Sequence, residues 1–184
     1  SCSKDKHFDG PNYLMDDFEA ISTTDELVDE TGKWSFYQNS RESNSISIDT
    51  TIVHSGEQSL KFSAEPSVNG ASKSDIANNN LRFNEGETVE ISAWFYLSGT
   101  DNLDYIFLLD LEESVPIGSG PGLRFALEGS QGFLVVERNK FTESTLRQDS
   151  GSEVAFPRNE WVHLQIEINL QRKEKGTVKV WQDG

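Results

Sequence analysis

Apolar and polar residues alternate along two stretches of the chain, and this alternation predicts two long β-strands. In residues 87–97, apolar side chains occupy the odd positions from Val89 to Leu97. In residues 161–170, they occupy the even positions from Val162 to Leu170. Successive side chains of a strand point to opposite faces, so each strand is expected to have one buried face and one outer face.

Shorter alternating runs between turn signals predict six further strands. These cover residues 45–49, 59–65, 105–111, 122–128, 132–138 and 176–183. Leu60, Phe62, Leu123 and Phe125 are expected on buried faces, and Tyr105 falls in the apparent core set of residues 105–111. One helical turn is expected at residues 24–29. Many strands at this spacing, joined by turns, predict an all-β protein, an antiparallel jelly-roll β-sandwich.

The length of 184 residues favours a single core. We expect a tether over residues 1–12 and the sandwich domain over residues 13–184. Because Asp183-Gly184 is a strong hairpin-turn signal, a return strand is expected to follow.

The chain is strongly acidic, with 31 Asp and Glu against 16 Lys and Arg and a net charge of -15. Such a surface repels phosphate backbones, so nucleic acid is not an expected partner. No stretch approaches the roughly 20 apolar residues of a membrane span.

The single cysteine, Cys2, lies in a Ser-Cys-Ser-Lys-Asp-Lys start that resembles a bacterial lipoprotein after removal of its signal peptide. The resemblance implies lipidation at Cys2 and a cell-surface or periplasmic location. Contact with a membrane is then expected only through this anchor. The oligomeric state is left open.

Two groups of segments resemble known sugar-related families. Residues 15–19, Trp34, residues 46–51 and residues 54–62 are similar to the first third of jelly-roll carbohydrate-binding modules. Residues 161–164 and 176–184 are similar to the closing part of concanavalin A-like domains, which include laminin G-like modules and heparin-lyase-like polysaccharide lyases. The resemblance implies the same sandwich fold and a polysaccharide partner.

The first functional hypothesis is recognition of an extracellular polysaccharide by an outer sheet face. Sugar rings dock on flat aromatic side chains, while amide and carboxylate groups bind the hydroxyls. The outer faces of the two long strands offer this mixture. The candidate carbohydrate-binding residues are Trp94, Tyr96, Trp161, Gln165, Glu167 and Glu90.

The alternative is a polysaccharide lyase that acts by β-elimination on a uronate. This reaction needs a group that neutralises the carboxylate, a base for the C5 proton and an acid for the leaving oxygen. Lys73 and Arg124 are candidate neutralisers, His163 is the candidate base and Tyr96 is preferred to Tyr105 as the acid. The sequence departs from the lyases at residues 72–77, where they carry Arg-x-Glu, and at residues 109–113, where they carry Gln and His.

Three further possibilities remain. A laminin G-like adhesion domain would bind protein, and a glycoside hydrolase would use a pair of carboxylates, which ranks below the lyase. By resemblance, Asp17, Glu19 and Asp49 are candidate ligands of a structural calcium ion. Zinc is not expected, since three scattered histidines and one cysteine provide no ligand spacing.

Overall fold

The computed structural model confirms an all-β fold of antiparallel strands and describes residues 7–113, 120–138, 145–171 and 175–184. The chain forms two compact units. Unit 1 comprises residues 1–91 and 166–180, and unit 2 comprises residues 92–165 and 181–184. Cys2 and the rest of residues 1–6 lie outside the described residues, so lipidation and location stay predictions.

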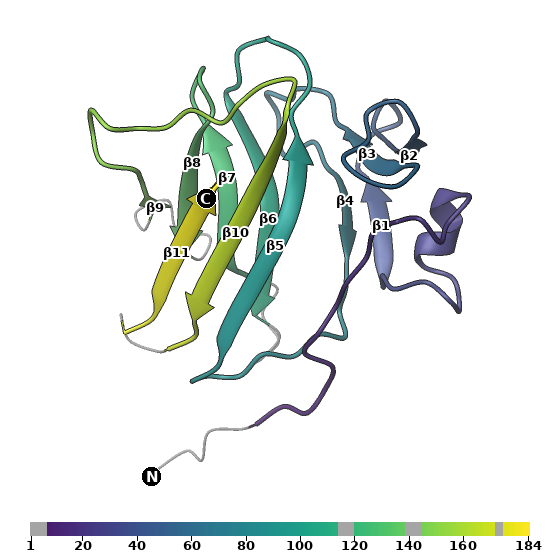
Figure 1. Cartoon of the computed structure of the whole chain (residues 1–184), viewed down its shortest axis with the longest axis horizontal. Coiled ribbons are helices and arrows are strands. Elements are labelled where there is room, and N and C mark those ends of the chain that lie inside the picture. The colour runs from purple at the N-terminus through teal and green to yellow at the C-terminus, as the bar shows by residue number, and fades with distance from the viewer. Residues whose placement is uncertain (1–6, 114–119, 139–144, 172–174) are drawn as a thin grey trace. The chain divides into compact units, whose positions relative to one another are not determined.

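Eleven strands and one short 3-10 helix are assigned in the described residues (Figure 1). The helix η1 covers Thr24–Leu27. The strands are β1 (Phe36–Asn39), β2 (Ser45–Asp49), β3 (Ser59–Ser63), β4 (Ser74–Ala77), β5 (Thr88–Tyr96), β6 (Tyr105–Glu113), β7 (Gly120–Glu128), β8 (Phe133–Arg138), β9 (Thr145–Leu146), β10 (Trp161–Asn169) and β11 (Thr177–Gln182).

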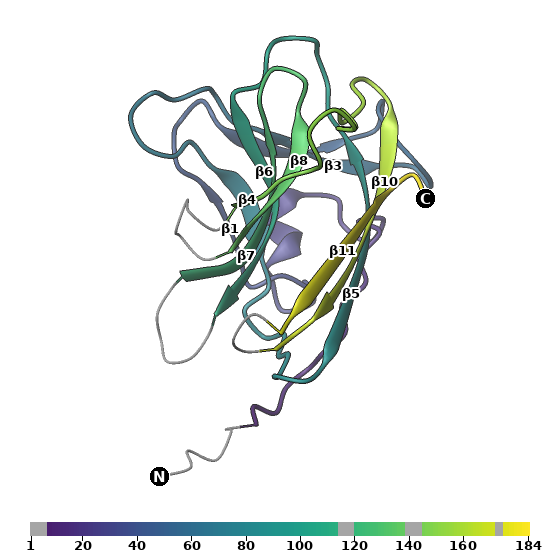
Figure 2. The same ribbon diagram turned by 90° about the vertical axis from the view of Figure 1, so that its left-hand side faces the viewer.

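Unit 2 is built from two sheets that share a core. One sheet has the order β6-β7-β8-β9, and the other has the order β11-β10-β5 (Figure 2). Residues of all three strands of the second sheet belong to both units. Leu127 of β7 and Val162 of β10 are fully buried in one cluster with Phe156. Phe95 of β5 and Leu134 of β8 pack against the same cluster. Within unit 2, therefore, apolar faces of both sheets meet, as the predicted sandwich requires.

The predicted inner faces of β10, one of the two long strands, and of the shorter strand β7 are confirmed. The even positions Val162, Leu164, Ile166 and Ile168 of β10 are at most 2% exposed. On β7, Phe125 and Leu127 are completely buried. The alternation thus identified the buried faces of these two strands correctly.

Two residues expected on buried faces are exposed instead. Phe62, on β3, has 44% of its surface exposed, and it lies in the part of this strand, residues 61–63, that is exposed on both faces. Tyr105, at the start of β6, is also 44% exposed. Its position follows from an irregularity in β6, where the register against β7 shifts between Phe107 and Leu109.

The register shift explains why the alternation misplaced Tyr105. Before it, Tyr105 and Phe107 lie opposite Glu128 and Ala126 on β7; after it, Leu109 lies opposite the buried Phe125. Residues directly opposite each other in a sheet share a face. The extra residue, Leu108, therefore moves Tyr105 and Phe107 to the outer face while Leu109 stays inside.

Unit 1 contains two small sheets, β1-β4 and β2-β3, and the helix η1. The amide of Asn44 is 5% exposed and joins separate segments: its Nδ2 donates to the Lys73 carbonyl at 2.7 Å, and its Oδ1 accepts from the Glu65 amide at 3.0 Å. No helix among the described residues is long and apolar enough to cross a membrane.

Candidate functional site

A charged group lies on the outer face of the β6-β7-β8 sheet; we call this surface the Arg124 face (Tyr105, Phe107, Asp110, Arg124 and Glu137). Asp110 and Arg124 are directly opposite each other on β6 and β7, and Arg124 is directly opposite Glu137 on β8. Arg124 donates from Nε and Nη2 to the two carboxylate oxygens of Asp110, each at 2.8 Å. Its guanidinium carbon lies 4.9 Å from the centre of the Phe107 ring. This pairing and stacking hold the cation in one orientation.

The Tyr105 hydroxyl reaches from β6 across β7 to Glu137, donating to Oε2 at 3.1 Å. Partial burial raises the pKa of Tyr105 to about 12; a hydrogen bond with Arg124 opposes the shift, and the Glu137 charge adds to it. The pKa of Arg124 is raised, first by its hydrogen bond to Asp110. Near neutral pH the Arg124 face thus holds a protonated phenol beside a permanent cation and a carboxylate.

A second group lies on the outer face of β5, β10 and β11; we call it the Trp94 face (Ser92, Trp94, Tyr96, Trp161, His163 and Trp181). The Trp94 and His163 rings stack with centroids 4.6 Å apart and planes at 13°. Nε2 of His163 lies 2.7 Å from the Ser92 hydroxyl, with which it forms a hydrogen bond. Tyr96 and Trp161 meet edge to face at 5.5 Å. The structure therefore brings Trp94, Tyr96, Trp161 and His163 together on one surface.

Trp181 belongs to the same surface, although the alternation alone did not single it out. Along β11, Val178, Val180 and Gln182 are the less exposed positions, so Trp181 points outward. Asp183 fixes the register, because its amide donates to the His163 carbonyl at 2.9 Å and its Oδ1 accepts from the His163 amide at 2.8 Å. Trp94 and Trp181 have 44% and 39% of their surfaces exposed.

The two faces lie on opposite sides of the unit 2 core. Arg124 is three residues from Leu127 on β7, and His163 is next to Val162 on β10, while Leu127 and Val162 share the core cluster. An odd separation along a strand reverses the direction of the side chain. Arg124 and His163 therefore point away from the shared core in opposite directions, and one groove does not contain both.

The other predicted site residues are placed as follows. Gln165 is exposed on β10 in unit 2. Lys73, Glu90 and Glu167 belong to unit 1. Lys73 directly precedes β4, and its amide donates to the Ser40 hydroxyl at 2.8 Å. The Glu167 carboxylate accepts a hydrogen bond from Lys179 at 2.7 Å.

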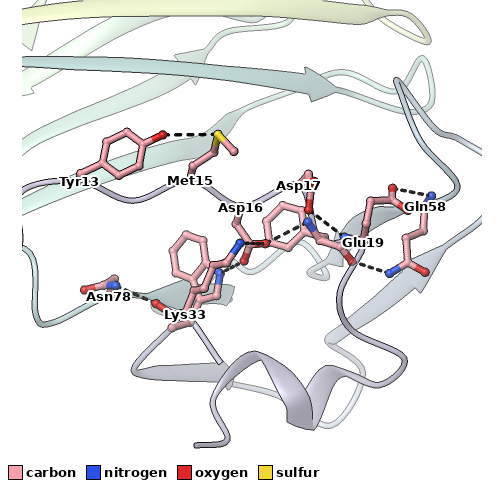
Figure 3. Close-up of polar contacts among 10 residues, drawn as sticks. Tyr13, Met15, Asp16, Asp17, Glu19, Lys33, Gln58 and Asn78 are labelled. Carbon is pink, nitrogen blue, oxygen red and sulfur yellow. Dashed lines mark hydrogen bonds and ion pairs between the residues drawn. The ribbon is translucent and has the colours of Figure 1, made fainter. Parts of the chain in front are cut away.

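Of the predicted calcium ligands, Asp17 and Glu19 lie in one turn of unit 1 (Figure 3), and Asp49 lies at the end of β2. Glu19 accepts amide hydrogen bonds from Glu57 and Gln58 at 3.1 and 3.2 Å. Asp17 accepts from the Glu19 amide at 3.2 Å, and Asp49 accepts from the amides of residues 51 and 52. In the part of the chain that is described, no group of three or more His, Cys, Asp or Glu could hold a metal ion. These carboxylates already accept backbone N–H donors, and the calcium ion stays a prediction.

Comparison with known proteins gives one match. A family model described as "Polysaccharide lyase" matches residues 29–184. No curated protein and no solved structure matches the chain. The matched range includes every residue of both the Arg124 face and the Trp94 face.

Proposed function

Because this chain belongs to the polysaccharide lyase family, we propose that it cleaves a uronate-containing polysaccharide by β-elimination on the Arg124 face. The observation that carries the proposal is the position of the Tyr105 hydroxyl, which bonds to Glu137 beside the Arg124 cation. A cation, a protonated acid and a carboxylate are the three groups that the reaction needs.

Each group has a defined step in this mechanism. Arg124 binds the substrate carboxylate and stabilises the negative charge that develops as the C5 proton leaves. Glu137 accepts that proton, and the C5–H electron pair forms the double bond between C4 and C5. As the bond from C4 to the glycosidic oxygen breaks, Tyr105 donates its proton to the leaving oxygen. The position of the Tyr105 hydroxyl beside Glu137 supports its role as the acid. With its raised pKa, as with the ordinary value of 10.0, the phenol is protonated before the reaction near neutral pH.

The proposal keeps Arg124 from the residues predicted by sequence and replaces two others. His163 and Tyr96, the predicted base and acid, lie on the Trp94 face, on the other side of the core from Arg124. The alternation predicts Tyr105 inside, which favours Tyr96 as the acid; the 44% exposure of Tyr105 removes this reason.

A second candidate function is binding without cleavage, and Asp110 favours it. Asp110 lies in the segment where the resembling lyases carry Gln and His, and its carboxylate neutralises Arg124. An arginine that is already paired attracts a uronate less strongly than an unpaired one. In this second function, the chain binds a polysaccharide and does not cleave it.

An absorbance assay separates the two functions. Elimination creates a double bond conjugated to the carboxylate, which absorbs in the ultraviolet. The protein is incubated with polyglucuronate, polygalacturonate, alginate and heparan sulfate, and absorbance is followed with time. The lyase proposal requires product from at least one polymer. Binding without cleavage is supported if a polymer retards the protein in an affinity gel and no product forms.

Variants then test the assigned groups. Tyr105→Phe removes the acid and Arg124→Ala removes the cation, so each is expected to lower kcat about 100-fold or more. Tyr13→Phe is the matched control, because Tyr13 is 75% exposed and lies in unit 1. Full activity in Tyr105→Phe would exclude Tyr105 as the acid.

A further inference from the structure

The rings of the Trp94 face lie on three neighbouring strands, and those on the two outer strands, Trp94 and Trp181, are exposed. Trp94 lies on β5, His163 and Trp161 on β10, and Trp181 on β11, in the sheet order β11-β10-β5. Neighbouring strands are about 4.8 Å apart, so β5 and β11 are separated by about 10 Å. This is enough for aromatic rings on the outer strands to contact different sugar units of one chain.

From this arrangement we propose that the Trp94 face is a second polysaccharide-binding site, separate from the Arg124 face, that holds an uncharged stretch of polysaccharide. The proposal rests on membership of the lyase family and on the geometry of this face; it does not need the lyase reaction itself. The two faces point away from the same core, so a polysaccharide on the Trp94 face leaves the Arg124 face open.

The side chains of this face match the chemistry of sugar rings. The axial C–H groups of a pyranose pack on the flat face of an indole, and Trp94 and Trp181 are both exposed for such contact. The Trp94 ring has a fixed orientation, because it stacks on His163, which is held by Ser92. A ring that is held in place loses little conformational entropy when it binds a ligand.

The charges on this face favour an uncharged ligand. Asp183 is the charged side chain beside these rings on the unit 2 part of the sheet, and it accepts the His163 amide proton. Among the described residues that define the Trp94 face, none is a lysine or an arginine. Lys179, two residues before Trp181 on β11, belongs to unit 1 and is paired with Glu167 at 2.7 Å. A uronate would therefore find no unpaired lysine or arginine among these side chains and would meet the repulsion of an acidic protein, whereas hydroxyl groups carry no such penalty.

Affinity electrophoresis in native gels tests this site. The probes are three soluble neutral polysaccharides, namely hydroxyethyl cellulose, a galactomannan and an arabinoxylan, with polygalacturonate as the charged comparison. We expect at least one neutral polymer to retard the protein. Each of Trp94→Ala and Trp181→Ala should weaken this retardation between about twofold and tenfold, the range expected for one aromatic contact. Trp94→Phe keeps a flat ring and should retain most of the binding.

Controls distinguish this site from the proposed active site. Tyr13→Ala removes an exposed aromatic residue elsewhere and should bind as the unmodified protein does. Tyr105→Phe should also bind normally. Cleavage of short uronate oligosaccharides, which are too small to reach both faces, should be unchanged in Trp181→Ala. Circular dichroism verifies that each variant is folded.

The inference is overturned if no neutral polymer retards the protein. It is equally overturned if retardation is the same in folded Trp94→Ala and Trp181→Ala, or if Tyr13→Ala loses as much. Neither result bears on cleavage, because the absorbance assay with short substrates reports the Arg124 face alone.

Discussion

Arg124 and Asp110 form a bidentate ion pair across β6 and β7, with both N···O distances at 2.8 Å. The side chains are 24% and 17% exposed, so water screens the pair only in part. The pair lies just beyond the register shift that brings Tyr105 and Phe107 to the same face. Asp110 therefore orients the guanidinium that the proposed reaction uses.

The first prediction concerns this ion pair. Asp110→Asn leaves Arg124 half-buried without a charged acceptor, and we expect the free energy of unfolding to fall by about 1–3 kcal/mol. Glu128→Gln is the control, because it breaks a pair with Arg147 whose side chains are 31% and 59% exposed. The control should cost less than about 1 kcal/mol. Urea unfolding measures both variants, and equal losses would contradict the prediction.

The second prediction concerns the core that joins the two sheets of unit 2. Leu127 is completely buried against Val162 and Phe156, so Leu127→Ala should remove these contacts and leave a cavity. The expected loss is about 2–5 kcal/mol. Leu146→Ala, at a position that is 57% exposed, should change stability by less than about 1 kcal/mol. If both variants unfold at the same urea concentration, Leu127 does not have the central role assigned to it.

The sequence predicted the long strands well, because burial of one face requires strict alternation. Val162 and Leu164 of β10 and Phe125 of β7 are buried as expected. The alternation did not predict the short strands β1, β4 and β9, since segments of two to four residues are too short to show a period.

The arrangement of the site was harder to predict. A prediction from alternation requires that β6 pairs with β7 without interruption. One extra residue, Leu108, instead places Tyr105 and Phe107 on the opposite face of the sheet from Leu109. The pairing of Trp94 with His163 depends on which strands are neighbours and on their register. A single sequence contains neither piece of information. Polar residues on outer faces were therefore found, but their partners were not.

The third prediction concerns the contact between Gly56 and Glu19 in unit 1. Gly56 has φ +76°, and a Cβ there would lie 2.3 Å from Oε1 of Glu19. Gly56→Ala should therefore strain the backbone and displace a carboxylate that accepts the amides of Glu57 and Gln58. We expect a loss of about 2–4 kcal/mol.

Gly70→Ala is the matched control for this contact, because Gly70 has φ +78° with no atom within 4 Å of the added Cβ. It should cost about 1–2 kcal/mol through the backbone alone. A double-mutant cycle completes the test: in a Glu19→Ala background, Gly56→Ala should cost no more than Gly70→Ala. An undiminished cost in that background would show that Glu19 is not the obstacle.

The last prediction uses the titration of Tyr105. Its pKa is raised from 10.0 to about 12, first by partial burial, so the folded state holds the phenolic proton more tightly than the unfolded state does. Between pH 10 and 12 the unfolded state loses this proton first, and stability must fall as the pH rises.

Tyr105→Phe has no phenolic proton to lose and should show a smaller fall in the urea midpoint between pH 10 and 12. Tyr13→Phe should keep the full fall, since Tyr13 is 75% exposed. A fall of the same size in Tyr105→Phe would mean that the folded and unfolded states hold this proton equally, and it would contradict the raised pKa of Tyr105.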